Sequence, residues 1–137
     1  MTDNPYNVTV GLLIKTEQEP RIISEIMELH PSKIIRNNKV SHILNEQDCP
    51  MLWIHREHYT EQNDVDDCVE HFFGRIPNIK KKISAINAIG IVKLRISIVS
   101  EYGQFGFGFS PNIIKLLSDL DISLDVSIFS YGMCIDE

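Results

Sequence analysis

Three strand-like runs and one amphipathic helix in the last third of the chain constrain its fold most strongly. Apolar and polar residues alternate over Val92–Ile98, which predicts a strand with one face in the core and the other in water. Phenylalanines alternate with small residues over Gln104–Phe109, which predicts a hairpin partner for that strand. Ser110 and Pro111 then predict a helix start, because serine caps orphan N–H groups and proline at the first helical position loses no hydrogen bond. Leu124–Tyr131 is predicted to be the last strand.

The first two thirds of the chain mix strand and helix patterns. Strands are predicted at Val8–Lys15 and Met51–Arg56, and the second holds the only tryptophan. Helices are predicted after Pro20 as far as His30, over Val65–Phe73 and over Asn78–Ala88. The segment 32–50 is polar and weakly patterned, so it is predicted to be a long loop that can include a short strand over Val40–Leu44, and a turn or ragged helix entry is predicted over Tyr59–Asn63.

The order of these elements predicts the fold class. We expect an α+β fold with a mixed or mostly antiparallel sheet of about five strands and with helices packed on one face. Residues 1–137 are expected to form a single domain, since no repeat or linker interrupts them. In the last helix, one apolar stripe is predicted to dock on the sheet; it consists of Ile113, Ile114, Leu116, Leu117 and Leu120.

Composition narrows the classes of partner and the expected compartment. Thirteen basic and nineteen acidic residues give a net charge of −6, which disfavours nucleic acid, because affinity for it depends on Lys and Arg neutralising phosphates. No apolar run approaches the roughly twenty residues that span a bilayer, and no signal peptide precedes the first strand, so we expect a cytoplasmic protein with no membrane partner. Three cysteines are odd in number and widely spaced, so no disulfide framework is expected.

Two motifs suggest chemistry at first sight, but their geometry argues against it. His55, His58 and Cys68 are residue types that bind zinc. The two histidines are three positions apart on a strand, so they are predicted to point to opposite faces, and Cys68 is predicted to lie on the buried side of its helix. Gly106 and Gly108 alternate with phenylalanines instead of joining a strand to a helix, which does not fit a phosphate-binding loop. We therefore expect no metal, no cofactor and no enzymatic activity.

The charge distribution suggests a binding surface more strongly. Between positions 57 and 70 the chain has no Lys or Arg, and its acidic residues there are Glu57, Glu61, Asp64, Asp66, Asp67 and Glu70. These acids are explained either by a solvated helix face, where the helix dipole favours each by about 0.3–1 kcal/mol, or by a docking surface for a basic protein. They are the predicted partner-binding residues.

Two other functions remain open from the residues alone. A small enzyme or a small-molecule-binding domain would use the sheet face opposite the helices, with polar groups from Lys93, Arg95, Asp125 and Tyr131 converging in one pocket. A self-associating subunit would instead present an exposed apolar sheet face. The oligomeric state is left open.

The C-terminal part of the chain carries a family resemblance. The segments Phe109–Leu120 and Ile122–Ile128 resemble the C-terminal signature of the bacterial domain-of-unknown-function 4279 family, in which a serine-proline helix of leucines leads into a strand with alternating acids. The likeness extends in element order to the helix that ends at His30, to the strand of Trp53 and to the acidic helix. The chain departs from the family pattern at Ser127, where a second aspartate is expected.

This resemblance implies a function without chemistry. The family has no activity to carry over, but small acidic domains of this kind are often immunity proteins in bacterial toxin systems, including those of contact-dependent growth inhibition. The resemblance thus implies a non-enzymatic toxin inhibitor, or antitoxin, whose partner is a cognate toxin protein. A basic toxin such as a nuclease would be neutralised when an acidic surface occludes its active site.

Overall fold

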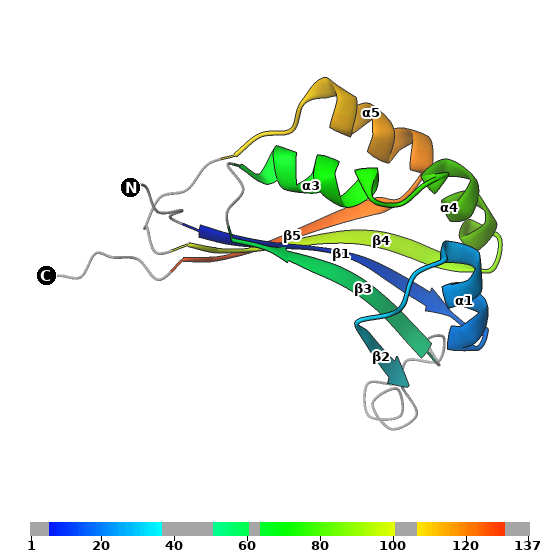
Figure 1. Ribbon diagram of the computed structural model, residues 1–137. Helices are drawn as coiled ribbons and strands as arrows, with labels where there is room; N and C mark the ends of the chain where they lie inside the picture. The colour runs from blue at the N-terminus through cyan, green and yellow to red at the C-terminus, as the bar shows by residue number, and fades with distance from the viewer. Residues whose placement is uncertain (1–5, 37–50, 61–63, 101–106, 131–137) are drawn as a thin grey trace, which may run out of the picture.

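The computed structural model describes residues 6–36, 51–60, 64–100 and 107–130 of the chain. In these residues the elements are β1 (Tyr6–Thr16), α1 (Pro20–Met27), β2 (Lys33–Arg36), β3 (Met51–Tyr59), α3 (Val65–Gly74), α4 (Ile79–Asn87), β4 (Gly90–Ser100), α5 (Pro111–Leu120) and β5 (Ser123–Ser130). The helices lie on one side of a twisted sheet (Figure 1). The predicted α+β class is confirmed.

The sheet is mixed and has the strand order β2-β3-β1-β4-β5. The first strand of the chain, β1, is central and pairs antiparallel with both β3 and β4. At one edge β2 pairs antiparallel with β3. At the other edge β5 runs parallel to β4, because the chain crosses over through α5 before it returns to the sheet.

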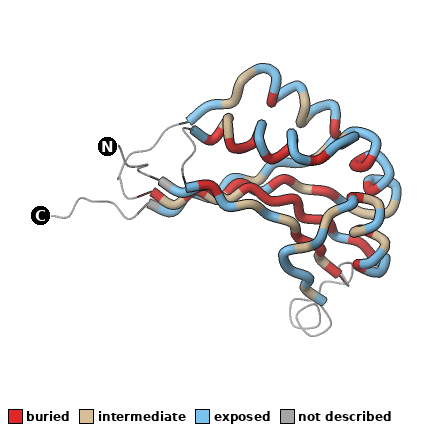
Figure 2. The backbone as a smooth tube through the Cα atoms, in the orientation of Figure 1, coloured by how far each residue is buried: buried red, intermediate tan, exposed pale blue. Residues whose placement is uncertain are grey.

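The core lies between the helices and one face of the sheet. Alternation in β1 turns Val8, Val10, Leu12 and Ile14 toward the helices, and all four are buried. Trp53 of β3 is fully buried on the same side, and its Nε1–H donates to Ser24 Oγ in α1 at 3.0 Å. In Figure 2 the buried parts of the tube face one another across these two layers.

The predicted apolar face of α3 is confirmed, since Val65, Cys68, Val69, Phe72 and Phe73 are all buried. The predicted stripe of α5 is only partly correct. Ile113 and Leu120 are buried, whereas the side chain of Ile114 is 57% exposed. The reason is that α5 packs mainly against the helices α3 and α4 and not against the sheet. Two helices cover a narrower strip of its surface than a sheet would.

Two strand predictions differ from the structure. The strand β2 lies at Lys33–Arg36, inside the segment predicted to be a loop, and the predicted strand at 40–44 lies outside the described residues. The hairpin prediction is wrong, because both sides of β4 are taken by β1 and β5, and the part of Gln104–Phe109 that is described, Phe107–Phe109, forms no strand. Strand β3 continues to Tyr59, where a turn was predicted to begin, and residues 61–63 lie outside the described ranges.

Within those ranges, none of the helices combines the length and the apolar character that crossing a membrane requires.

Candidate functional site

The first turn of α3 gathers several carboxylates. Asp64 is the N-cap residue, and its Oδ1 accepts a hydrogen bond from the backbone N–H of Asp67 at 2.9 Å. Asp66 and Asp67 occupy the same turn. Repulsion from the Asp64 carboxylate is the main cause that raises the pKa of Asp67 above its usual value. The capping bond positions these side chains, and their like charges strain the arrangement.

Asp66 makes a contact within the fold. Its side chain is half-buried, and its Oδ1 accepts a hydrogen bond from the backbone N–H of Ser110 at 2.8 Å. Ser110 is the N-cap residue of α5, so this bond joins the starts of two helices. One oxygen of the predicted partner-binding carboxylate of Asp66 is therefore already engaged within the fold.

Glu57 lies away from the start of α3. Its carboxylate oxygens are 3.2 Å from Arg75 Nη1 and 3.5 Å from His55 Nε2. Arg75 is the C-cap residue of α3, and a ten-residue helix is about 15 Å long, so Glu57 and Asp64 lie at opposite ends of that helix. The predicted acids that the structure describes therefore do not form one patch.

Asp64, Asp67 and Glu70 remain as the acidic surface of α3. Asp64 and Glu70 are exposed and Asp67 is half-buried. Glu61 lies outside the described residues. None of the three has an ion pair with a Lys or Arg of the described chain, whereas Lys82 pairs with Glu28 and Lys80 with Asp119.

The histidines of β3 lie on opposite faces of the sheet, as predicted. His55 is on the helix side, where its Nδ1–H donates to the carbonyl oxygen of His30 at 2.8 Å. His58 is on the open side, with its Nδ1 2.8 Å from Thr9 Oγ1. Cys68 is buried, and desolvation raises the pKa of its thiol to about 11. This thiol is therefore a poor nucleophile at neutral pH.

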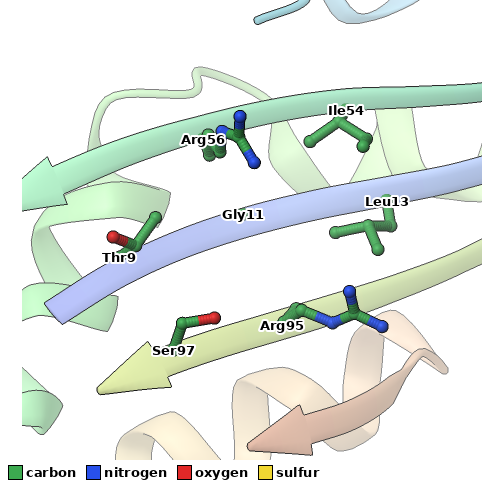
Figure 3. A pocket seen from close by; sticks show the side chains of 7 residues that line it. All are labelled: Thr9, Gly11, Leu13, Ile54, Arg56, Arg95 and Ser97. Carbon is green, nitrogen blue, oxygen red and sulfur yellow. The ribbon is translucent and has the colours of Figure 1, made fainter. Parts of the chain in front are cut away.

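The face of the sheet that no helix covers carries a second candidate site. The register places Gly11 of β1 directly between Arg56 of β3 and Arg95 of β4. Figure 3 shows a hollow at this point, lined also by Thr9, Leu13, Ile54 and Ser97. A Cβ atom added to Gly11 would lie 3.1 Å from Arg56 Cβ, so the glycine permits close approach of the two strands and leaves the floor of the hollow bare.

Three of the four polar residues proposed for the open face converge. Asp125 Oδ2 lies 3.2 Å from Lys93 Nζ and 3.6 Å from Arg95 Nη2. The hydrogen bond from Lys93 is the main cause that lowers the pKa of Asp125. Parallel pairing of β4 with β5 sets Arg95 opposite Asp125, and Tyr131 lies outside the described residues.

Sequence reasoning did not find Gly11 and Arg56. The alternation in β1 and β3 places both residues on the strand face that points away from the core. Only the pairing of β3 with β1 brings Gly11 and Arg56 together. The open face also collects positive charge, because its basic residues outnumber its one described carboxylate, Asp125. These basic residues are Lys15, Lys33, Arg56, Lys93 and Arg95.

Neither a curated protein nor a solved structure matches the chain. A family model described as a domain of unknown function, DUF4279, matches residues 5–131. The match covers every described strand and helix, including the acidic surface of α3 and the hollow over Gly11. The chain belongs to the DUF4279 family.

Proposed function

We propose that this chain is a non-enzymatic binding protein that neutralises a cognate basic bacterial toxin by occluding its active site. One observation carries the proposal: the acidic surface of α3 holds Asp64, Asp67 and Glu70 with no Lys or Arg partner among the described residues. The family resemblance adds support, since small acidic domains of this kind are often immunity proteins. The cytoplasm is the proposed compartment, because an immunity protein must meet the toxin inside the cell that it protects.

Like charges at the start of α3 repel one another. Asp64 raises the pKa of Asp67, which means that the ionised pair is held at a cost in the folded chain. A cationic partner would reduce this repulsion. A toxin with a basic cleft would gain a faster encounter and a fixed orientation from these carboxylates.

The partner is to be captured with the tagged full-length chain from its source cell, at low and at moderate salt. We expect one basic protein that stays bound at moderate salt and that kills cells unless this chain is co-expressed. A bait that captures nothing at either salt concentration, or a captured protein whose toxicity this chain does not suppress, contradicts the proposal.

Charge reversal then tests the acidic surface itself. Asp67→Lys combined with Glu70→Lys leaves the Asp64 cap intact and should weaken binding of the captured toxin at least about tenfold, with a melting temperature within a few degrees of the parent. The control is Glu17→Lys combined with Glu25→Lys, which changes the net charge equally near α1. Equal losses in both double variants would show a general charge effect and no docking at α3.

A second candidate function is binding of a small molecule on the open sheet face. The convergence of Lys93 and Arg95 on Asp125 favours it, because a recognition site needs a few polar groups that meet at one place.

A further inference from the structure

We propose that the hollow over Gly11 binds the phosphate group of a small organic phosphate between Arg56 and Arg95. This inference rests on the second candidate function, ligand binding on the open face, and is independent of toxin neutralisation. The acidic surface lies on α3, which packs on one face of the sheet, whereas the hollow lies on the opposite face (Figures 1 and 3).

The register builds the hollow from three adjacent strands. Gly11 pairs with Arg56 on one side and with Arg95 on the other, so the two arginine Cα atoms are about 10 Å apart across the glycine. From positions this far apart, the two long arginine side chains can reach one phosphate group from two sides. Gly11 has no side chain to fill the gap, and the hollow has a volume of about 60 Å³. This exceeds the space that a single water needs, roughly 10–15 Å³, and suits a small polyatomic group.

The groups around the hollow select an anion. Arg56 is exposed and belongs to none of the ion pairs of the described chain. Arg95 is 3.6 Å from Asp125, which Lys93 also neutralises, so a positive charge remains on this side. A guanidinium is a planar fork of donors that matches two oxygens of a phosphate.

Hydroxyl groups complete one end of the hollow. Thr9 and Ser97 are paired neighbours in β1 and β4, two positions from Gly11 and Arg95 along their strands, and both line the hollow. The Ser97 hydroxyl can donate a hydrogen bond to a phosphate oxygen. The Thr9 hydroxyl lies 2.8 Å from His58 Nδ1 and can donate to a phosphate when that nitrogen carries the proton. The side chains that line the hollow therefore include guanidinium and hydroxyl donors and no carboxylate, which disfavours a cationic ligand.

The other end of the hollow accommodates an organic group. Leu13 and Ile54 line it there and are almost fully buried. An adjoining hollow of about 160 Å³ shares Leu13 and Arg95 with the first and is otherwise lined by Lys15, Leu52, Ile91 and Lys93. Apolar walls beside an anion site fit a ligand with a phosphate head and a short apolar body better than they fit inorganic phosphate.

Isothermal titration calorimetry with the purified full-length chain tests this site, with phenyl phosphate, inorganic phosphate and phenol as probes at fixed ionic strength. We expect phenyl phosphate to bind more tightly than inorganic phosphate and phenol to give no measurable binding. Arg56→Gln and Arg95→Gln should each weaken phenyl phosphate binding at least about tenfold, because each removes charged hydrogen bonds. Arg56→Lys keeps the charge, loses the fork and should bind with intermediate affinity.

The matched control is Lys33→Gln, which removes one positive charge from the same face at a residue that lines neither hollow. Its affinity for phenyl phosphate should equal that of the parent. Absence of phenyl phosphate binding, or an equal loss in Lys33→Gln and Arg56→Gln, overturns the proposal. The Asp67→Lys and Glu70→Lys double variant should bind phenyl phosphate at least as well as the parent, so failure of this site and failure of toxin neutralisation are separate results.

Discussion

Two glycines show how the same residue type has opposite roles within this fold. A Cβ atom at Gly90 would lie 2.5 Å from the carbonyl oxygen of Lys15 and 3.0 Å from Thr16 Cβ. The Thr16 hydroxyl donates to the carbonyl oxygen of Ile89 at 2.7 Å, so the end of β1 and the start of β4 are held close together. A Cβ atom added to Gly74, at the end of α3, would have no neighbouring atom within 4 Å.

We therefore expect Gly90→Ala to lower the free energy of unfolding by about 1–3 kcal/mol. The added Cβ atom would clash with the backbone of Lys15, which cannot move aside as a flexible side chain could. Gly74→Ala should raise the free energy of unfolding by about 0.5–1 kcal/mol, because alanine loses less conformational entropy in a helix. Urea unfolding followed by circular dichroism measures both. A neutral result for Gly90→Ala would mean that β1 and β4 are not held as closely as described.

The raised pKa of Asp67 predicts how the stability of the fold depends on pH. Its pKa is raised in the folded chain, so the fold holds this proton up to a higher pH than the unfolded chain does. The contribution of Asp67 to the free energy of unfolding is therefore lost as the pH rises through the pKa that Asp67 has in the folded chain. This loss is complete at neutral pH. Asp67→Asn should raise the melting temperature at pH 7 and change it little at pH 3, where both states bind the proton. An equal shift at the two pH values would exclude charge repulsion as the cause.

At the scale of elements, α5 was the most predictable part of the chain because its signals are local. Ser110 and Pro111 marked its start, and the structure begins the helix there, with Ser110 Oγ accepting from the N–H of Ile113 at 3.4 Å. The hairpin prediction was wrong because the partners of β4 come from distant parts of the chain, and the alternation over Gln104–Phe109 carries no information about which strands pair. The helix cap could be predicted from neighbouring residues, whereas the pairing of distant strands could not.

Ser110→Ala tests how much that cap contributes. The substitution removes the cap acceptor and should lower the free energy of unfolding by about 0.5–2 kcal/mol. Ser118→Ala is the control, since Ser118 is an exposed residue inside the same helix and alanine favours helix there. Chemical denaturation of both variants gives the comparison. Equal stability of the two variants would show that the cap does not support α5.

At the scale of the whole molecule, the sequence predicted the layers but not the location of the charges. The apolar side of each strand was readable from alternation, and this was enough for the class of fold. The predicted acids are close in sequence, but the structure separates Glu57 from those of α3, because Glu57 belongs to β3 and faces the far end of that helix. The cluster of Gly11, Arg56 and Arg95 was invisible for the opposite reason, since its members are distant in sequence and meet only through pairing.

The central position of β1 has a consequence for the synthesis of the chain. In the sheet Val8 pairs with Tyr59 and Ile98, both of which are translated well after it. At roughly 5–20 residues per second, an apolar strand leaves the ribosome several seconds before β4 exists to pair with it. The nascent chain must therefore keep one side of this apolar strand unpaired until β4 has been made, and the sheet can close only after that.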